Sequence, residues 1–157
     1  MNRKAFNGLP TVNPSFERPT YGMLSRIDGK QRFELLLMPK ELTVERSGEF
    51  PVTSNGINPF VTWSGEQPEI MSFTVPIAGY PDKDVTAYSD KLMDLRKPDP
   101  QKKTPPLLIW RWGQRTFTPC IMPSCSRREF DWYPSGKLKS CEVSITLLKV
   151  NRNSVVL

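Results

Sequence analysis

An alternation of apolar and polar residues near the C-terminus is the strongest pattern in the chain. From residue 141 to residue 148 every second side chain is apolar, and most of the residues between them are polar. Successive side chains of a strand point to opposite faces of a sheet, so the pattern predicts a half-buried strand. Its core face is expected to hold Cys141, Val143, Ile145 and Leu147, and its other face Glu142, Ser144, Thr146 and Leu148.

Shorter alternating segments predict the remaining strands. Pro39 interrupts the first of them and predicts a corner between two strands. Gly113 and Gln114 suit a two-residue hairpin turn, because the glycine comes first. The turn-dense residues 51–70 are expected to form a long loop. The predicted strands cover residues 33–38, 42–45, 70–77, 107–112, 116–122 and 125–133.

One segment has the period of a helix instead. Val85, Tyr88, Leu92 and Leu95 are spaced by three, four and three residues, which predicts about three amphipathic turns. Asp82 or Asp84 is expected to cap the N-terminus, and the helix is expected to stop near Lys97 because Pro98 follows it. Together these elements predict a mainly β fold, an antiparallel barrel or sandwich with one flanking helix and long loops.

The length of 157 residues predicts one domain. We expect an extended arm over residues 1–30, the β domain over residues 31–150 and a tail over residues 151–157. The arm lacks the apolar run of a signal peptide, and no segment reaches the length of a membrane span. We therefore expect assembly in the cytoplasm and no membrane partner.

The composition offers little material for catalysis. The chain has no histidine, which is the commonest general base and metal ligand at neutral pH. Cys120, Cys125 and Cys141 are irregularly spaced, and they fit small buried apolar residues better than a metal site or a disulfide framework. The carboxylates are dispersed, and no nucleotide-binding or hydrolase motif occurs. We predict no catalytic, cofactor-binding or metal-ligating residue, and no enzyme.

The net charge is +6, and much of it lies in one stretch. Residues 96–115 contain six basic residues and one acidic residue, Asp99. Such a stretch could meet phosphate or an acidic protein, and we favour the protein. The expected partner surface consists of Lys102, Lys103, Arg111 and Arg115.

The segment LLIWRWGQRTFTPCIM, residues 107–122, allows two interpretations. Trp110 and Arg111 could form a stacking platform in a β barrel that binds single-stranded nucleic acid. Alternatively, Leu108, Trp110 and Trp112 share one strand face, which fits a core. We favour the core and keep the nucleic-acid barrel as the alternative function, with a small lytic or wall-binding factor as a third.

The order of these segments resembles a known family. FELLLMPKELTVERS is followed by IMSFTVPIAGY, the helix DVTAYSDKLMDLR, the hairpin TPPLLIWRWGQRTFTPCIM and the closing EFDWYPSGKLKSCEVSITLLKV. This order is similar to that of the tube and baseplate-adaptor proteins of contractile injection systems and contractile-tailed phages. Many members carry a LysM module behind the tube-like domain, and we expect none after Val150. The matching positions are Pro39, Lys40 and Glu41 in the corner, Pro105, Pro106, Trp110, Trp112 and Gly113 in the hairpin, and Phe130, Gly136, Cys141, Val143 and Ile145 in the closing strands, with Leu138 where the family often has Pro.

The resemblance implies a structural protein of a phage virion tail, a baseplate or an injection particle. Its subunits would form a ring, a hexamer in this family, that extends the inner tube or joins it to the hub and spike of the baseplate. Its partners would be further copies of itself, the tail tube protein and the hub or spike proteins, with DNA or an effector only as cargo. Glu142, Ser144 and Thr146 would then face the channel.

Overall fold

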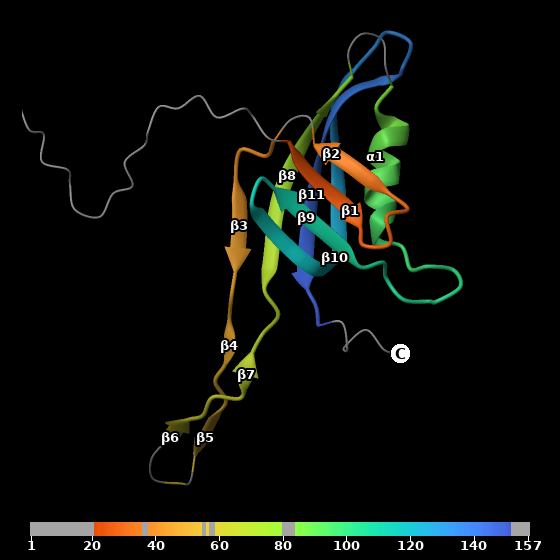
Figure 1. The fold of residues 1–157 in the computed structure, drawn as a ribbon. Coiled ribbons are helices and arrows are strands. Elements are labelled where there is room, and N and C mark those ends of the chain that lie inside the picture. The colour runs from red at the N-terminus through yellow and green to blue at the C-terminus, as the bar shows by residue number, and fades with distance from the viewer. Residues whose placement is uncertain (1–20, 36–37, 55, 57–58, 80–83, 152–157) are drawn as a thin grey trace, which may run out of the picture.

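The computed structural model describes residues 21–35, 38–54, 56, 59–79 and 84–151. Within this part of the chain a seven-stranded antiparallel sheet and one α-helix form the body, and a narrow ribbon projects from it (Figure 1). The predicted mainly β, antiparallel fold with one flanking helix is confirmed. The body contains β1 (Gly22–Arg26), β2 (Arg32–Leu35), β3 (Leu42–Glu45), β8 (Ile70–Ala78), α1 (Thr86–Met93), a 3-10 turn (Asp94–Arg96), β9 (Leu108–Trp112), β10 (Arg115–Trp132) and β11 (Leu138–Lys149).

The sheet folds over its own core. Its strand order is β2-β1-β9-β10-β11-β8-β3, and β1, β2 and β9 cross in front of β8 and β11 (Figure 1). Phe73 of β8 and Trp110 of β9 are not on neighbouring strands, yet their ring centroids lie 6.1 Å apart. The two halves of the sheet therefore pack against each other. The fully buried side chains between them include Leu24, Leu35, Leu108, Trp110, Phe117, Val143, Ile145 and Leu147.

The helix closes the side of the core that the sheet leaves open. Its Leu92 is fully buried, and Tyr88 donates a hydrogen bond to the carbonyl oxygen of Glu34 at 3.0 Å. On the other flank Arg127 of β10 donates to Ser89 Oγ at 2.9 Å and forms an ion pair with Asp90. The helix thus joins β2 to β10, two strands that are not neighbours in the sheet.

The predicted C-terminal end of the helix agrees with the structure, whereas the N-cap is Val85, one residue after the predicted Asp84. Asp84 Oδ1 accepts the Thr86 N–H at 2.8 Å, so Asp84 satisfies a free donor of the first turn. Lys97 has a ψ of 134°, which is the extended conformation that a following proline favours. Asp82, the other predicted cap, lies outside the described residues.

Two predicted boundaries were wrong. Gly22–Arg26, assigned to the arm of residues 1–30, forms β1 between β2 and β9, where Leu24 is fully buried. Apolar residues at 23 and 24 alone were too few to show a strand period. Residues 1–20 of the predicted arm lie outside the described residues. In addition, the two strands predicted over 116–122 and 125–133 are one strand, β10, whose pairing register shifts near Pro119 and again between Ile121 and Ser124.

The segment expected to be a long loop is a β ribbon. β4 (Gly48–Glu49) pairs with β7 (Gly65–Glu66), and β5 (Val52–Ser54) pairs with β6 (Pro59–Val61). The ribbon extends β3 and β8 away from the body (Figure 1). The many turn residues obscured this pairing, because two- and three-residue strands are too short to show a period.

Candidate functional site, a hydroxyl-lined face of the sheet

The outer face of β3, β8, β11 and β10 is lined mostly by serine and threonine. Cross-strand pairing places Ser144 between Ser126 and Thr74. It places Thr146 between Ser124 and Ser72, and Ser72 next to Thr43 of β3. The predicted alternation of β11 accounts for this arrangement, since Val143, Ile145 and Leu147 fill the core behind these hydroxyl groups. We call these residues, with Arg128 and Glu142, the hydroxyl face.

The hydroxyl face is close to electrically neutral. Thr74 Oγ1 and Ser144 Oγ share a hydrogen bond of 3.0 Å. Its charged residues on β10 and β11 compensate each other, because Arg128 Nη2 lies 2.8 Å from Glu142 Oε2. Such a surface offers hydrogen bonds to water or to a passing polymer, but no field that would hold a polyanion.

Glu142, Ser144 and Thr146, the predicted channel-facing residues, lie together in one shallow groove of about 610 Å³. Lys40 and Glu41 of the predicted corner close one side of it. The groove is a surface with polar walls, and the remaining lining residues are Thr43, Ser72, Phe73, Thr74, Pro76 and Ile145.

Beside this face, both edges of the sheet have stretches that no described strand covers. β3 pairs only with Ile70–Phe73 of β8, and no described strand covers the rest of that edge. Gly79 donates its N–H to the carbonyl oxygen of Lys139 in β11 at 2.9 Å. Because backbone groups alternate in direction along a strand, the N–H of Thr74 points the other way, to the uncovered side. Pro76 also faces that side, but it has no N–H to donate.

The second open edge belongs to β10. β9 pairs with β10 only as far as Cys120, and within the described chain residues 121–132 have β11 as their one partner strand. Phe130 and Trp132 on this stretch are 49% and 51% exposed. Unpaired edges and exposed aromatic side chains at one place mark a surface that another chain can cover.

The four predicted partner-surface residues do not form one surface. Lys102 and Lys103 lie on the connector between the helix and β9. Arg111 lies on the opposite face of β9 from Trp110, while Arg115 is paired across the hairpin with Trp112 on the Trp110 side. The alternation of β9 separates Arg111 and Arg115, and the distance along the strand separates both from the lysines.

The interpretation of Trp110 as a base-stacking residue was wrong. Its side chain is completely buried and contacts the rings of Phe73 and Trp112, at centroid distances of 6.1 and 6.4 Å. A base cannot stack on a ring without solvent access. The hairpin turn in the same segment is confirmed, with Gly113 at a φ of 60°.

The cysteines are held as protonated thiols. Burial raises the pKa of Cys120 from 9.0 to about 12, and its Sγ donates to the carbonyl oxygen of Leu108 at 3.3 Å. Burial also raises the pKa values of Cys125 and Cys141. No group of three possible metal ligands occurs among the described residues, and no helix there is long and apolar enough to cross a membrane.

Comparison with known proteins gave structural likenesses only. No family model and no curated protein matches the sequence. The chain is similar to a chain in the cryo-EM structure of the anti-feeding prophage baseplate, with a TM-score of 0.45 and 8% identity over 88% of this chain and 93% of that one. It is also similar to a chain of the sheath–tube complex of PVC, an extracellular contractile injection system, in its extended state, with a TM-score of 0.44 and 14% identity over 88% and 90%. Likeness at this level assigns no function to this chain.

Proposed function

We propose that this chain is a structural subunit that assembles with copies of itself into a ring around a channel in a contractile tail or injection particle. The observation that carries the proposal is the three-stranded segment of β8, β11 and β10, which has the hydroxyl face on one side and, among the described residues, an uncovered stretch along each edge. The order of sequence motifs supports it independently.

The two edges suit a head-to-tail assembly. The edge of β8 that holds Thr74 differs from the edge of β10 that holds Phe130, so one copy's β8 can pair with the next copy's β10. A repeated contact between two different surfaces generates a ring when the rotation closes. Each added copy removes one open edge of its neighbour, which is the usual means of keeping edge strands from uncontrolled pairing.

The hydroxyl face would line the channel in this assembly. Its neutral hydroxyl groups would let DNA or a protein effector pass without electrostatic trapping, since cationic surfaces bind nucleic acid through its phosphates. The family resemblance points to six subunits, and to a ring that extends the inner tube or connects it to the baseplate hub and spike.

The test is the size and shape of the purified protein, measured by mass photometry and negative-stain microscopy. We expect rings, and we expect Thr74→Pro to abolish them because it removes an outward N–H. Thr74→Ala is the matched control, because it loses the hydroxyl but keeps the donor. A chain that remains monomeric at high concentration, or a Thr74→Pro variant that forms normal rings, would contradict the proposal.

A further inference from the structure

The ribbon carries an aromatic patch that the described residues leave largely uncovered. Phe50 and Trp63 contact edge to face, with centroids 4.9 Å apart, yet they are 57% and 56% exposed. Val52 and Val61 beside them are equally accessible. Trp63 is held in place over Gly48, where an added Cβ would lie 2.2 Å from its ring. A positioned and exposed aromatic pair is typical of a contact that another molecule completes.

The ribbon is also acidic. Residues 45–69 contain four glutamates and one arginine, which gives a net charge of −3. Arg46 is paired with Glu69 at 2.5 Å. Glu49 and Glu66, which flank the aromatic pair, form no ion pair with any described residue. We call residues 45–69 the acidic ribbon.

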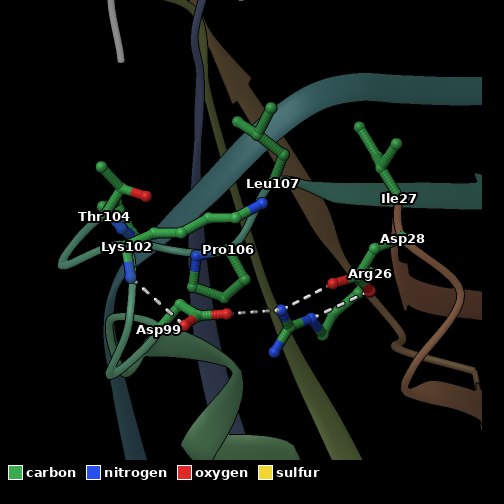
Figure 2. Close-up of a pocket in the computed structure, with 9 residues that line it drawn as sticks. Arg26, Ile27, Asp28, Asp99, Lys102, Thr104, Pro106 and Leu107 are labelled. Carbon is green, nitrogen blue, oxygen red and sulfur yellow. Dashed lines mark hydrogen bonds and ion pairs between the residues drawn. The ribbon is translucent and has the colours of Figure 1, made fainter. Parts of the chain in front are cut away.

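A cleft on the body has the complementary chemistry. It has a volume of about 320 Å³ and lies between the end of β1 and the connector that leads to β9 (Figure 2). Its apolar lining residues include Ile27, Pro106 and Leu107, and Lys102 also lines it. The lining itself holds two basic and two acidic residues, Arg26 and Lys102 with Asp28 and Asp99. The positive excess comes from the adjoining connector: residues 96–103 contain four basic residues and Asp99, for a net charge of +3, and Lys97 among them is paired with Asp94. We call this the basic cleft.

The basic cleft is preformed, because hydrogen bonds within the connector fix its loop. Asp99 donates its N–H to the Thr104 carbonyl oxygen at 2.9 Å, and Lys103 donates to the Asp99 carbonyl oxygen at 2.8 Å. The Asp99 carboxylate accepts the Gln101 N–H at 2.9 Å and lies 3.7 Å from Arg26, which also pairs with Asp28 (Figure 2). The acidic groups of the cleft are thus used in holding the loop. The ammonium groups of Lys102 and Lys103 form no ion pair within the described chain.

These two surfaces belong to different sides of the molecule. In Figure 1 the ribbon extends from the lower end of β3 and β8, whereas the connector of residues 97–106 projects on the side of the helix. The ribbon therefore points away from the cleft of its own chain. The acidic ribbon and the basic cleft have complementary charges, and each has apolar side chains. Because they lie on different sides of one chain, these features indicate a contact between two copies.

We propose that the acidic ribbon of one copy docks in the basic cleft of the next, with Phe50 and Trp63 against the apolar wall and Glu49 and Glu66 facing Lys102 and Lys103. This inference rests on the proposed self-assembly and names a second contact in it. Because ribbon and cleft are different surfaces, the contact is directional and reinforces the head-to-tail pairing of strand edges. It also explains why the connector is basic.

Charge exchange tests the contact. We expect Lys102→Glu with Lys103→Glu, and separately Glu49→Lys with Glu66→Lys, to raise the concentration needed for assembly by about tenfold, since two attractive pairs become repulsive. A chain with all four substitutions should recover at least part of this loss. Substitution of Lys91 and Lys137 by Glu is the control for a general change in net charge, because both lysines are exposed and form no ion pair with a described residue. The proposal would be overturned if both double variants assemble normally. It would also be overturned if both assemble more weakly and the fourfold variant recovers none of the loss.

Cross-linking separates this proposal from the ring. A Thr62→Cys chain is mixed with a Thr104→Cys chain, and a short thiol cross-linker is added, with the unmodified protein as control for its own cysteines. Dimers that contain one chain of each kind are expected. Rings without such dimers would overturn the ribbon contact and leave the ring intact. Cross-linked dimers from a protein that forms no rings would support the ribbon contact and contradict the proposed ring.

Discussion

The body and the acidic ribbon of this chain are both antiparallel β structure, but different contacts stabilise them. In the body every strand except β3 has buried side chains in the core, and Trp110 and Val143 have no solvent access. In the ribbon the strands are two or three residues long, and Phe50 and Trp63 remain more than half exposed. The body therefore has a core of its own, whereas the apolar surface of the ribbon would be buried by the proposed contact with a second copy.

The largest expected effect comes from the centre of the body. Trp110→Ala should lower the free energy of unfolding by about 3–5 kcal/mol, because it leaves a cavity among Phe73, Trp112 and their neighbours. Urea unfolding followed by circular dichroism measures it. Trp110→Phe should retain more of the stability, since it also removes the indole N–H, which has no hydrogen-bond partner among the described residues. A cost below about 1 kcal/mol for the alanine variant would mean that the body is less tightly packed than the buried areas indicate.

The next effect depends on pH. Burial raises the pKa of Cys120 from 9.0 to about 12, so above pH 9 the unfolded chain releases this proton while the folded chain keeps it. The stability of the body should therefore be unaffected by this thiol below pH 9 and fall above it, by about 1.4 kcal/mol per pH unit. Unfolding curves between pH 8 and about 10.5 measure the slope. The Cys120→Ala variant should lack the pH dependence that comes from this thiol. Equal slopes of the free energy of unfolding against pH for the variant and the unmodified protein would contradict the prediction.

A smaller loss should follow from detaching the helix. Arg127 contacts Ser89 and Asp90 of α1 and lies 2.9 Å from Glu129 on its own strand. Its replacement by alanine should cost about 1–2 kcal/mol, because charged hydrogen bonds between helix and sheet are lost. Arg128→Ala is a matched control on the neighbouring position, where the exposed pair with Glu142 contributes less. Similar losses for the two variants would show that the contacts of Arg127 with the helix contribute little to its attachment.

The smallest effect on the isolated chain should come from the ribbon. Trp63→Ala removes an exposed ring, so the free energy of unfolding of the body should change by less than about 0.5 kcal/mol. The same variant should clearly weaken assembly, as measured by mass photometry. A large loss of stability in the monomer would show that ribbon and body fold as one unit.

Segments with long, regular patterns were predicted well. The alternation of β11 spans eight residues, and the helical spacing from Val85 to Leu95 spans three turns, so each pattern outweighs local irregularity. The residues Glu142, Ser144 and Thr146 were placed on one polar face by the same alternation, and the structure brings them into one groove. Their role as a channel lining remains a prediction.

The acidic ribbon and the split of the basic stretch were not predicted. The signal for the ribbon was present, since Phe50 and Trp63 flank Asn55 and Gly56 at similar distances, as two arms of a hairpin would. A strand of two or three residues is too short to show an alternating period in the sequence, so it is recognised only when its partner strand is seen. The turn residues between these strands favoured the prediction of a loop. The basic residues were grouped by their closeness in sequence, but the pleat of β9 and β10 sends Arg111 and Arg115 to different faces.

Local order in this chain follows from its own pattern of side chains. Period and turn chemistry depend on residues a few positions apart, so the last strand, the helix with its ends, and the turn at Gly113 could be derived from the amino acids alone. Strand partners depend on contacts between residues far apart in the sequence. Only the folded chain shows that β1 lies inside the sheet and that β2 and β3 take its opposite edges although they are consecutive. Only there is it seen that no described strand covers the edges beside the hydroxyl face. These choices are set by which arrangement buries Trp110, Phe73 and their neighbours together, and that is a property of the whole core.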